Sequence, residues 1–269
     1  MTENSRSGDQ FDSNFWDNPK LWDNYDKGGD LRSRLWWIVE RIAPNEQRVL
    51  DIGCGRGDLL EILSGRAKAF GLDLSVEALR RCKSPVVKAS ATALPFGDKS
   101  LDIVCLTDLL EHLNDADHRR VLKEVDRVAR HYIFVSVPWM ERPAQARTKC
   151  FRCGTIFNAD SHCRTTQSIQ TMRVLITGWH LREHFLAGPA IQRPPSWVYW
   201  CYRHIGGIWA FWGQHLRCPE CGNEDAPPPP CFSMRVWRKA WGAFCRIGIA
   251  FSKPKPSFFL GCYERASPL

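Results

Sequence analysis

The alternation of short apolar runs with helical segments between Arg48 and Pro138 most constrains how this chain can fold. Strands are expected at Arg48–Ile52, Ala69–Leu74, Val86–Ala89, Leu101–Leu106 and Tyr132–Val137. Helices are expected at Asp58–Ser64, Val76–Cys82 and Arg119–Ala129. Strands and helices that alternate at this spacing predict a parallel sheet with helices on both faces.

The flanking segments extend this α/β core. Helical spacing of apolar residues predicts helices at Leu31–Ile42 and Thr166–Leu175, and two further strands are expected at Trp179–Ala187 and Ser257–Glu264. Residues 141–165 are polar and predict a loop. The resulting hypothesis divides the chain into an aromatic helical lead (1–45), a core (46–140, 164–190 and 256–266) and two insertions (141–163 and 191–255).

The bulk composition fits a globular protein, with 44% hydrophobic and 25% charged residues. The net charge of +8 permits binding to nucleic acid, anionic lipid or a phosphorylated substrate, but requires none of them. No run approaches the roughly 18 to 20 apolar residues that span a bilayer. The polar first residues lack the order of a signal peptide, so we expect a cytoplasmic protein.

A glycine-rich turn follows the first strand of the core at Asp51–Asp58 and leads directly into a helix. Glycines let the backbone approach a ligand closely, and a helix start offers free N–H groups. About twenty residues later, the second strand ends near Asp73, whose carboxylate can accept the hydroxyls of a ribose. These features predict a nucleotide-type cofactor, although a dehydrogenase would satisfy the same pattern.

Four motifs in order resemble those of the Rossmann-like class I S-adenosylmethionine-dependent methyltransferases, type 11/12. They are the turn at Val49–Gly57, the acid Asp73, the segments Ser90–Phe96 and Ser100–Val104, and the Leu-Glu-His-Leu run at Leu110–Leu113. The resemblance implies a seven-stranded, mostly parallel sheet and S-adenosylmethionine as the cofactor, with Asp51 at its methionine end. The cofactor-binding residues that it implies are Asp51, Gly53, Cys54, Gly55, Gly57, Asp73, Leu74, Ser90, Ala91 and Thr107. Ser90 departs from the family, which often has an acid near this position for the adenine.

The resemblance also implies a mechanism in which the nucleophile, the methyl carbon and the sulfur are held in line. His112 is the candidate base for a hydroxyl acceptor, and the alternative is that Glu111 and His112 only cap and orient their segment, a helix start that we expect to include Asp108. Ubiquinone-type O-methyltransferases and small-RNA ribose methyltransferases hold a divalent metal with a similar arrangement and a later histidine, here matched by His162. Asp108 replaces the longer glutamate of that pattern, which disfavours a catalytic metal.

Two copies of a CxxCG motif are the strongest metal signal in the chain. Cys150 and Cys153 form one pair, and Cys218 and Cys221 form the other. Four thiolates complete the tetrahedral shell of a structural zinc ion. If the predicted strands follow the methyltransferase topology, both pairs emerge at the cofactor face of the sheet, where a zinc module would shape substrate access. The alternatives are two separate pairs, or a ligand contributed by His162 or Cys163.

Aromatic residues are concentrated on both sides of the second cysteine pair, and those after it alternate with basic residues. The aromatic residues include Trp197, Tyr199, Trp200, Tyr202, Trp209, Phe211, Trp212, Trp237, Trp241, Phe244 and Phe251, and Arg235 to Lys255 contains six basic residues and no acid. Such a segment could lie on an anionic membrane surface or stack nucleic-acid bases. The alternative is that these aromatics pack the zinc module onto the core.

The leading functional hypothesis is methyl transfer to an oxygen or nitrogen of a small-molecule, glycan or lipid-linked acceptor. Resemblance to methyltransferases with paired CxxC motifs favours this hypothesis weakly, since they accompany polysaccharide and secondary-metabolite pathways. The alternatives are an RNA methyltransferase that grips RNA with its zinc module and a non-catalytic scaffold that retains the cofactor fold. The acceptor and the oligomeric state do not follow from the sequence.

Overall fold

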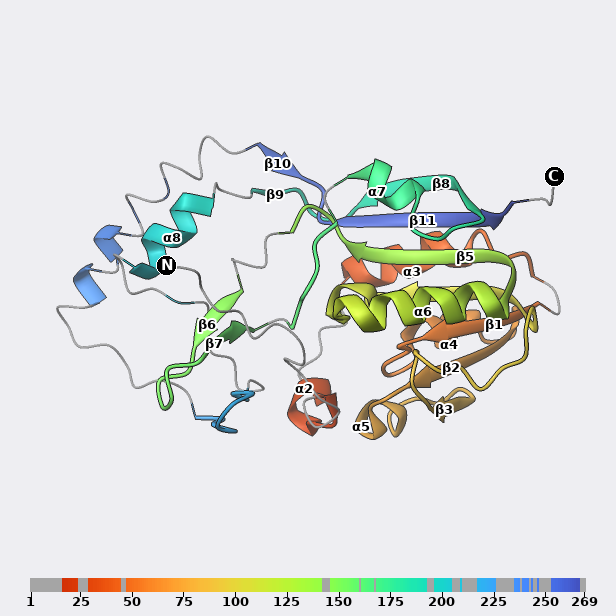
Figure 1. Ribbon diagram of the computed structural model, residues 1–269, viewed down its shortest axis with the longest axis horizontal. Coiled ribbons are helices and arrows are strands. Elements are labelled where there is room, and N and C mark those ends of the chain that lie inside the picture. Colours follow the sequence, from red (N-terminus) through yellow and green to blue (C-terminus); the bar gives the residue numbers. More distant parts are fainter. Residues whose placement is uncertain are drawn as a thin grey trace.

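Seven strands form one mixed sheet in the order β3-β2-β1-β4-β5-β11-β8 (Figure 1). The computed structural model describes residues 16–23, 29–44, 47–141, 146–159, 161–166, 168–192, 196–204, 209, 217–225, 235–237, 239–241, 243, 246 and 253–266. The strands are β1 (Arg48–Ile52), β2 (Lys68–Asp73), β3 (Val86–Lys88), β4 (Leu101–Thr107), β5 (Ala129–Pro138), β8 (Trp179–Ala187) and β11 (Phe258–Arg265). β11 lies between β5 and β8 and runs antiparallel to both of them. The predicted mostly parallel, Rossmann-like sheet is confirmed.

Helices cover both faces of this sheet. On one face, α3 (Gly29–Val39) and α4 (Asp58–Leu63) pack against the side chains of Val49, Ile103 and Phe134. On the other face, α6 (Asp115–Val128) and α7 (Ile169–Arg173) pack against a second set of strand residues that includes Leu50. Val49 and Leu50 face opposite sides because side chains alternate along a strand. Each such fully buried aliphatic side chain contributes roughly 1.5–3 kcal/mol to stability.

The helix boundaries differ from the sequence prediction in several places, and α3 covers Gly29–Val39 where Leu31–Ile42 was predicted. α6 begins at Asp115, four residues before the predicted start, since Asn114 caps it by accepting N–H bonds from Ala116 and Asp117. Its first turn is polar and therefore carries no apolar periodicity. The predicted Val76–Cys82 helix is shorter, as α5 (Val76–Leu79), and the predicted Thr166–Leu175 helix is the short α7.

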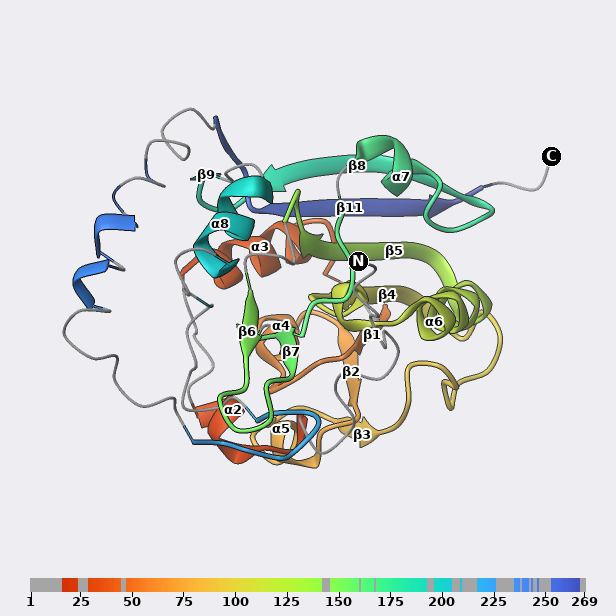
Figure 2. The same ribbon diagram turned by 60° about the vertical axis from the view of Figure 1, so that its left-hand side comes forward.

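The prediction of a loop at residues 141–165 is wrong in part. β6 (Arg147–Lys149) and β7 (Ile156–Asn158) pair as an antiparallel hairpin whose turn contains Cys150 and Cys153. The strands are only three residues long and mostly polar, so their pattern did not predict strands. The hairpin lies beyond the carboxyl end of β5, outside the main sheet (Figures 1 and 2).

The remaining described elements surround the same end of the sheet. They are α2 (Pro19–Asp23), the 3-10 turn η1 (Leu110–His112), α8 (Ser196–His204) and the two-stranded ribbon of β9 (Ile191–Gln192) and β10 (Pro254–Lys255). Among the described residues, no helix has the length and apolar character needed to cross a bilayer. The aromatic residues Phe211, Trp212, Phe244 and Phe251 lie outside the described residues.

Candidate functional site

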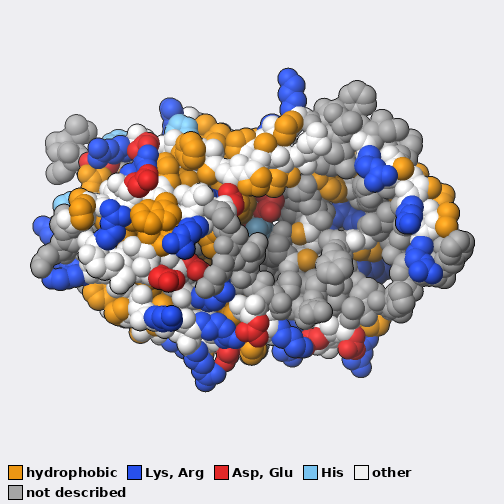
Figure 3. All heavy atoms as spheres, turned by 180° about the vertical axis from the view of Figure 1, so that it is seen from behind, with side chains coloured by type: hydrophobic (Ala, Val, Ile, Leu, Met, Phe, Trp, Pro, Cys, Tyr) orange, Lys and Arg blue, Asp and Glu red, His pale blue; other side chains and the backbone are white. Residues whose placement is uncertain are grey.

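A cavity of about 670 Å³ opens at the carboxyl ends of β1, β2 and β4. This is the edge at which ligands bind in open α/β sheets, and the volume is typical of a small-molecule site. Figure 3 shows a hollow in this face of the molecule, with acidic and histidine side chains inside it. We call the part lined by the glycine turn and Asp73 the cofactor half, and the part lined by Glu111, His112 and Ser161 the acceptor half.

The glycine turn leads the backbone along the wall of the cofactor half. Gly53 and Gly55 line the cavity with φ angles of 71° and 51°, which glycine adopts without strain. Gly57 differs, because it does not line the cavity. A Cβ atom at Gly57 would lie 2.3 Å from the Cys82 sulfur. Packing of the segment that follows α5 against the glycine turn therefore requires a glycine at this position. The predicted cofactor contact of Gly57 therefore has no support in the geometry.

Asp73 lies where a ribose-binding acid is expected. Its Oδ2 atom accepts a hydrogen bond from the Gly55 N–H at 2.9 Å, and its Oδ1 atom accepts one from the Ser75 N–H at 2.8 Å. Burial raises the pKa of Asp73, and these backbone donors oppose the rise. The two bonds fix the carboxylate at the cavity wall, with remaining lone pairs for a ligand.

Asp51 is the most deeply buried acid of the cofactor half. Its side chain is 1% exposed, and its Oδ1 atom accepts a hydrogen bond from the Thr107 hydroxyl at 3.2 Å. Burial raises the pKa of Asp51 to about 8. A cationic group of a ligand beside Asp51 would therefore stabilise the ionised form.

The other predicted cofactor residues line the same cavity. Cys54, Leu74, Ser90, Ala91 and Thr107 all contribute to its wall. The Ser90 hydroxyl lies 2.8 Å from the Thr92 hydroxyl, and Thr92 also lines the cavity. Two hydroxyls thus occupy the position where related enzymes often have an acid.

Two tryptophans of the aromatic lead (residues 1–45) lie over the cofactor half. Trp16 and Trp22 both line the cavity, and Trp22 is 6% exposed. The Trp22 Nε1–H donates to the Trp16 carbonyl at 2.7 Å and to the Ser75 hydroxyl at 3.1 Å. Asp17 fixes this segment further, because its Oδ1 atom accepts the Val76 N–H at 2.6 Å. The short α2 helix is thus held as a cover beside the glycine turn.

His112, the predicted base, lies in the acceptor half. Its Nδ1 atom is 2.7 Å from the Ser161 hydroxyl, and its ring packs edge-on against Trp16 and His162. Burial, together with the neighbouring His162, lowers the pKa of His112 to about 3. His112 is therefore neutral at pH 7 and a weak base.

Glu111 also belongs to the acceptor half. The residue is 4% exposed, and its Oε2 atom has no hydrogen-bond partner within the described part of the chain. Burial raises the pKa of Glu111 to about 8, and the charge of Asp108 adds to the rise. An unpartnered buried oxygen at a cavity wall is a position that a ligand can satisfy.

Asp108 does not join Glu111 and His112 at the start of one helix, so that prediction is wrong. Only residues 110–112 form the 3-10 turn η1, and Asp108 precedes it with a φ of 53°. Arg34, which is 5% exposed, pairs with Asp108 at 2.6 Å and draws that carboxylate toward α3. Ligand atoms of Glu111, His112 and His162 lie within 4.8 Å of one another, so these three residues could hold a divalent cation without Asp108.

Several residues around the acceptor half have strained backbone conformations. Asp108, Met140 and Ser161 have φ angles of 53°, 51° and 59°, which are unfavourable for residues other than glycine. Asp108 and Ser161 line the cavity, and Met140 precedes the lining residue Glu141. Strained residues persist where surrounding contacts hold them, and they cluster at functional sites.

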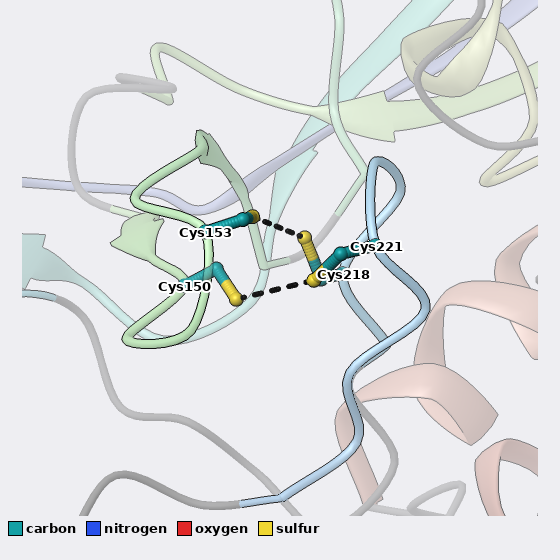
Figure 4. Close-up of side chains that lie close together, drawn as sticks. All are labelled: Cys150, Cys153, Cys218 and Cys221. Carbon is teal, nitrogen blue, oxygen red and sulfur yellow. Dashed lines mark hydrogen bonds between the residues drawn. The ribbon is translucent and has the colours of Figure 1, made fainter.

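The four predicted zinc ligands come together from two distant segments (Figure 4). The sulfur of Cys150 lies 3.7 Å from that of Cys221, and the sulfur of Cys153 lies 3.6 Å from that of Cys218. Tetrahedral zinc with Zn–S bonds of about 2.3 Å separates its sulfurs by about 3.8 Å. The cysteine arrangement, which we call the four-cysteine site, therefore fits one zinc ion. His162 and Cys163 are not part of this cluster.

The two cysteine turns have the same backbone pattern. In the first, the Gly154 N–H donates to the Cys150 carbonyl at 2.9 Å, and in the second the Gly222 N–H donates to the Cys218 carbonyl at 2.9 Å. Both glycines have positive φ angles, 81° and 68°. The shared CxxCG sequence thus produces two equivalent turns that present their sulfurs to one point.

Comparison with known proteins shows which family part of this chain matches. The profile of the family described as "Methyltransferase domain" matches residues 50–135. An uncharacterised protein of Methanocaldococcus jannaschii is 41% identical over 118 residues, 40% of this chain and 44% of that protein. A probable S-adenosylmethionine-dependent methyltransferase of Mycobacterium tuberculosis is 32% identical over 125 residues, 40% of this chain and 45% of that protein. The chain thus spans less than half the length of these curated relatives.

A solved structure shows the same fold over most of the chain. A S-adenosylmethionine-dependent methyltransferase from Archaeoglobus fulgidus superposes with a TM-score of 0.51 at 17% identity, covering 87% of this chain and 93% of that one. The strand order of the sheet, the cavity at its carboxyl edge and the matched family profile are all consistent with one another and with this fold. Residues 50–135 therefore match the methyltransferase-domain family, and the chain has the fold of a solved S-adenosylmethionine-dependent methyltransferase.

Proposed function

We propose that the protein transfers a methyl group from S-adenosylmethionine to an oxygen or nitrogen of a small-molecule, glycan or lipid-linked acceptor. One observation carries the proposal: Asp51, the glycine turn and Asp73 line the same cavity that continues to Glu111 and His112. A cofactor held by the first group would present its methyl group toward the second group. S-adenosylmethionine supplies an activated methyl group on its sulfonium sulfur.

The protein's contribution in this proposal is alignment. Asp51 would hold the methionine end of the cofactor and Asp73 its ribose, since each carboxylate is fixed by the hydrogen bonds described above. Holding reactants in line contributes roughly 7–11 kcal/mol to such reactions. His112, a weak base that contacts Ser161, is better suited to orient an acceptor by hydrogen bonding than to remove its proton.

The charge of the cavity supports an acceptor whose reacting end is neutral or cationic. Among the described lining residues, Arg56 is the one lysine or arginine, whereas seven carry a carboxyl group. The seven are Asp51, Asp58, Asp73, Asp108, Glu111, Asp117 and Glu141. This acidity contrasts with the net charge of +8 for the chain. Asp51 and Glu111 have raised pKa values, but a phosphate in the cavity would meet the negative charge of the other acidic residues, which disfavours RNA.

The test begins with calorimetry of the purified chain against S-adenosylmethionine and its demethylated product. We expect binding of both, and weaker binding of both by Asp73→Asn, which keeps the shape of the side chain. Labelled cofactor is then incubated with pools of amines, phenols, sugars and RNA, with and without Mg²⁺. Absence of cofactor binding by folded protein would refute the proposal, while labelling of RNA alone would favour the RNA alternative.

We infer further that the four-cysteine site holds a structural zinc ion. The sulfur spacings and the paired turns support this inference. All four ligands come from the chain, so the site leaves no open position for chemistry. Elemental analysis is expected to give one zinc per chain, and Cys153→Ser is expected to lower that value while Cys54→Ser, outside the site, does not.

A further inference from the structure

The hairpin of β6 and β7, which we call the zinc hairpin, continues directly into the wall of the acceptor half. Phe157 on β7 is 2% exposed and packs with Cys150 and Cys218 in a small core of its own. The chain then runs to Ala159, which packs against that core and also lines the cavity. The distance along the chain from the four-cysteine site to the acceptor half is thus only a few residues.

Residues 158–159 and 161–164, which we call the acceptor loop, are bonded to the turn that carries Glu111. The N–H groups of Cys163 and Arg164 both donate to the Glu111 carbonyl, at 2.7 Å and 3.1 Å. The Arg164 Nε–H donates to the Leu113 carbonyl at 3.1 Å. The backbone of η1 is therefore held from outside by the acceptor loop.

Side chains of the acceptor loop complete the connection. The Ser161 hydroxyl contacts His112 Nδ1 at 2.7 Å, although this requires a φ of 59° at Ser161. The Asn158 amide donates to the His162 carbonyl at 2.9 Å, and the His162 ring bonds to Glu141. A strained loop of this kind keeps its shape only while both of its ends are fixed.

The cofactor half has a different support. Gly53 and Cys54 donate their N–H groups to the Leu72 carbonyl at 2.9 Å and 3.0 Å, which joins the turn to β2 inside the main sheet. Between the second cysteine turn and α2, Lys20 and Glu224 form an ion pair at 3.3 Å. Both side chains of that pair are exposed, so it contributes little.

We propose that the zinc hairpin is the support of the acceptor half alone, with Asn158 and Ser161 as positioning residues that set His162 and His112. This proposal rests on the zinc ion inferred above. Loss of zinc would free one end of the acceptor loop while the cofactor half, which is built on the main sheet, keeps its shape. The four-cysteine site thus serves acceptor positioning and leaves cofactor affinity largely unchanged.

Hydrogen exchange of the full chain tests this division without knowledge of the acceptor. Zinc is removed with a chelator, and its release is quantified. We expect exchange at the Cys163 and Arg164 amides to rise by about tenfold or more, while amides of β1 and β2 keep their protection. The affinity for the demethylated cofactor is expected to change by less than about threefold, well under the tenfold that corresponds to 1.4 kcal/mol.

Three results would overturn the proposal. Unchanged protection of the acceptor loop would show that zinc does not support it. An equal loss of protection in β1 and β2 would make zinc a general structural element. A folded chain that binds the demethylated cofactor but no zinc would refute this proposal. A chain that binds zinc but not the demethylated cofactor would refute the proposed enzymatic function instead.

Substitutions in zinc-loaded protein test the positioning residues themselves. Ser161→Gly removes the hydroxyl at a φ angle that glycine tolerates, so folding should not suffer. We expect full zinc content, unchanged affinity for the cofactor product and a changed ¹⁵N resonance of His112 Nδ1, with the exposed His131 on β5 as the internal reference. Asn158→Asp, which lacks the amide donor, should raise exchange at the Cys163 amide, whereas Ile156→Val on the same strand should not. An unmoved His112 resonance in Ser161→Gly would contradict the assignment.

Discussion

Two buried carboxylates with raised pKa values face one cavity from its two halves. Asp51 lies in the cofactor half and Glu111 in the acceptor half, and burial raises the pKa of each to about 8. Both groups are therefore largely protonated in the free protein at pH 7. The consequence is a proton linked to ligand binding, which can be measured.

For Asp51 we can say whether cofactor binding releases or takes up a proton. The cofactor carries an ammonium group, and a cation beside Asp51 favours its ionised form, so binding at pH 7 should release a proton. Cofactor affinity should then rise as the pH increases toward the raised pKa of about 8 and level off above it. Calorimetry in two buffers of different ionisation enthalpy measures the released proton. Asp51→Asn should abolish the release, and an equal release from that variant would exclude Asp51 as its source.

The sequence predicted some site residues well and missed others for a physical reason. Asp51, Gly53 and Asp73 were predictable because they belong to local turns at strand ends, where spacing alone fixes their neighbourhood. Trp16, Arg34 and Ser161 reach the site through packing between distant segments, which no local pattern records. Gly57 belongs to the same motif but does not line the cavity, and a Cβ atom there would lie 2.3 Å from the Cys82 sulfur.

Among the helices and strands, α2 is a small element with a specific position. It has five residues, which is too short to be stable in isolation. Its placement depends on anchors to the core, namely the Trp22 indole at Ser75 and the pair of Asp23 with Arg81 at 2.6 Å. We infer that α2 closes the cofactor half and stays in place through these contacts.

Substitution of Trp22 tests the role of α2. Trp22→Leu removes the indole donor and most of the ring that covers Gly55. We expect affinity for the demethylated cofactor to fall by about tenfold, or 1.4 kcal/mol. Trp36→Leu is the matched control, since Trp36 lies half-exposed on α3 and outside the cavity lining. Equal affinities of the two variants would contradict the role assigned to α2.

The main elements of the fold followed from the sequence because central strands such as β1, β4 and β5 contain short apolar runs with turn residues near their ends. β1 and β8 have the predicted bounds, and β11 is displaced by one residue. The zinc hairpin was not predicted as strands, since its three-residue strands gain their stability from the buried Phe157 and the cysteine turns. Such short elements are specified by tertiary contacts, and these are invisible to periodicity.

At the scale of the whole molecule, aromatic side chains remain exposed away from the catalytic cavity. Trp197 and Trp200 on α8 are 54% and 53% exposed, and Trp237 is 50% exposed. Basic residues accompany them in the sequence, including Arg203, Arg235 and Lys239. Tryptophan and basic residues together are typical of surfaces that contact anionic membranes. Contact with a membrane surface therefore stays a proposal with a direct test.

Vesicle flotation provides that test. The full chain is expected to float with vesicles that contain an anionic lipid and to dissociate as salt rises, because each basic residue near such a surface contributes about 1 kcal/mol. Replacing Trp197 and Trp200 with serine should weaken the binding, while Val174→Ser, an exposed position on another element, should not. Equal recovery with neutral vesicles, or no recovery at all, would contradict membrane contact.

The antiparallel strand β11 has a consequence for the order of assembly. β5 and β8 do not pair with each other, because β11 occupies the place between them and bonds to both. During synthesis on the ribosome, β8 consequently waits for a strand that emerges only after both cysteine turns. The four cysteines are thus translated before β11, so the four-cysteine site can assemble before β8 joins the sheet.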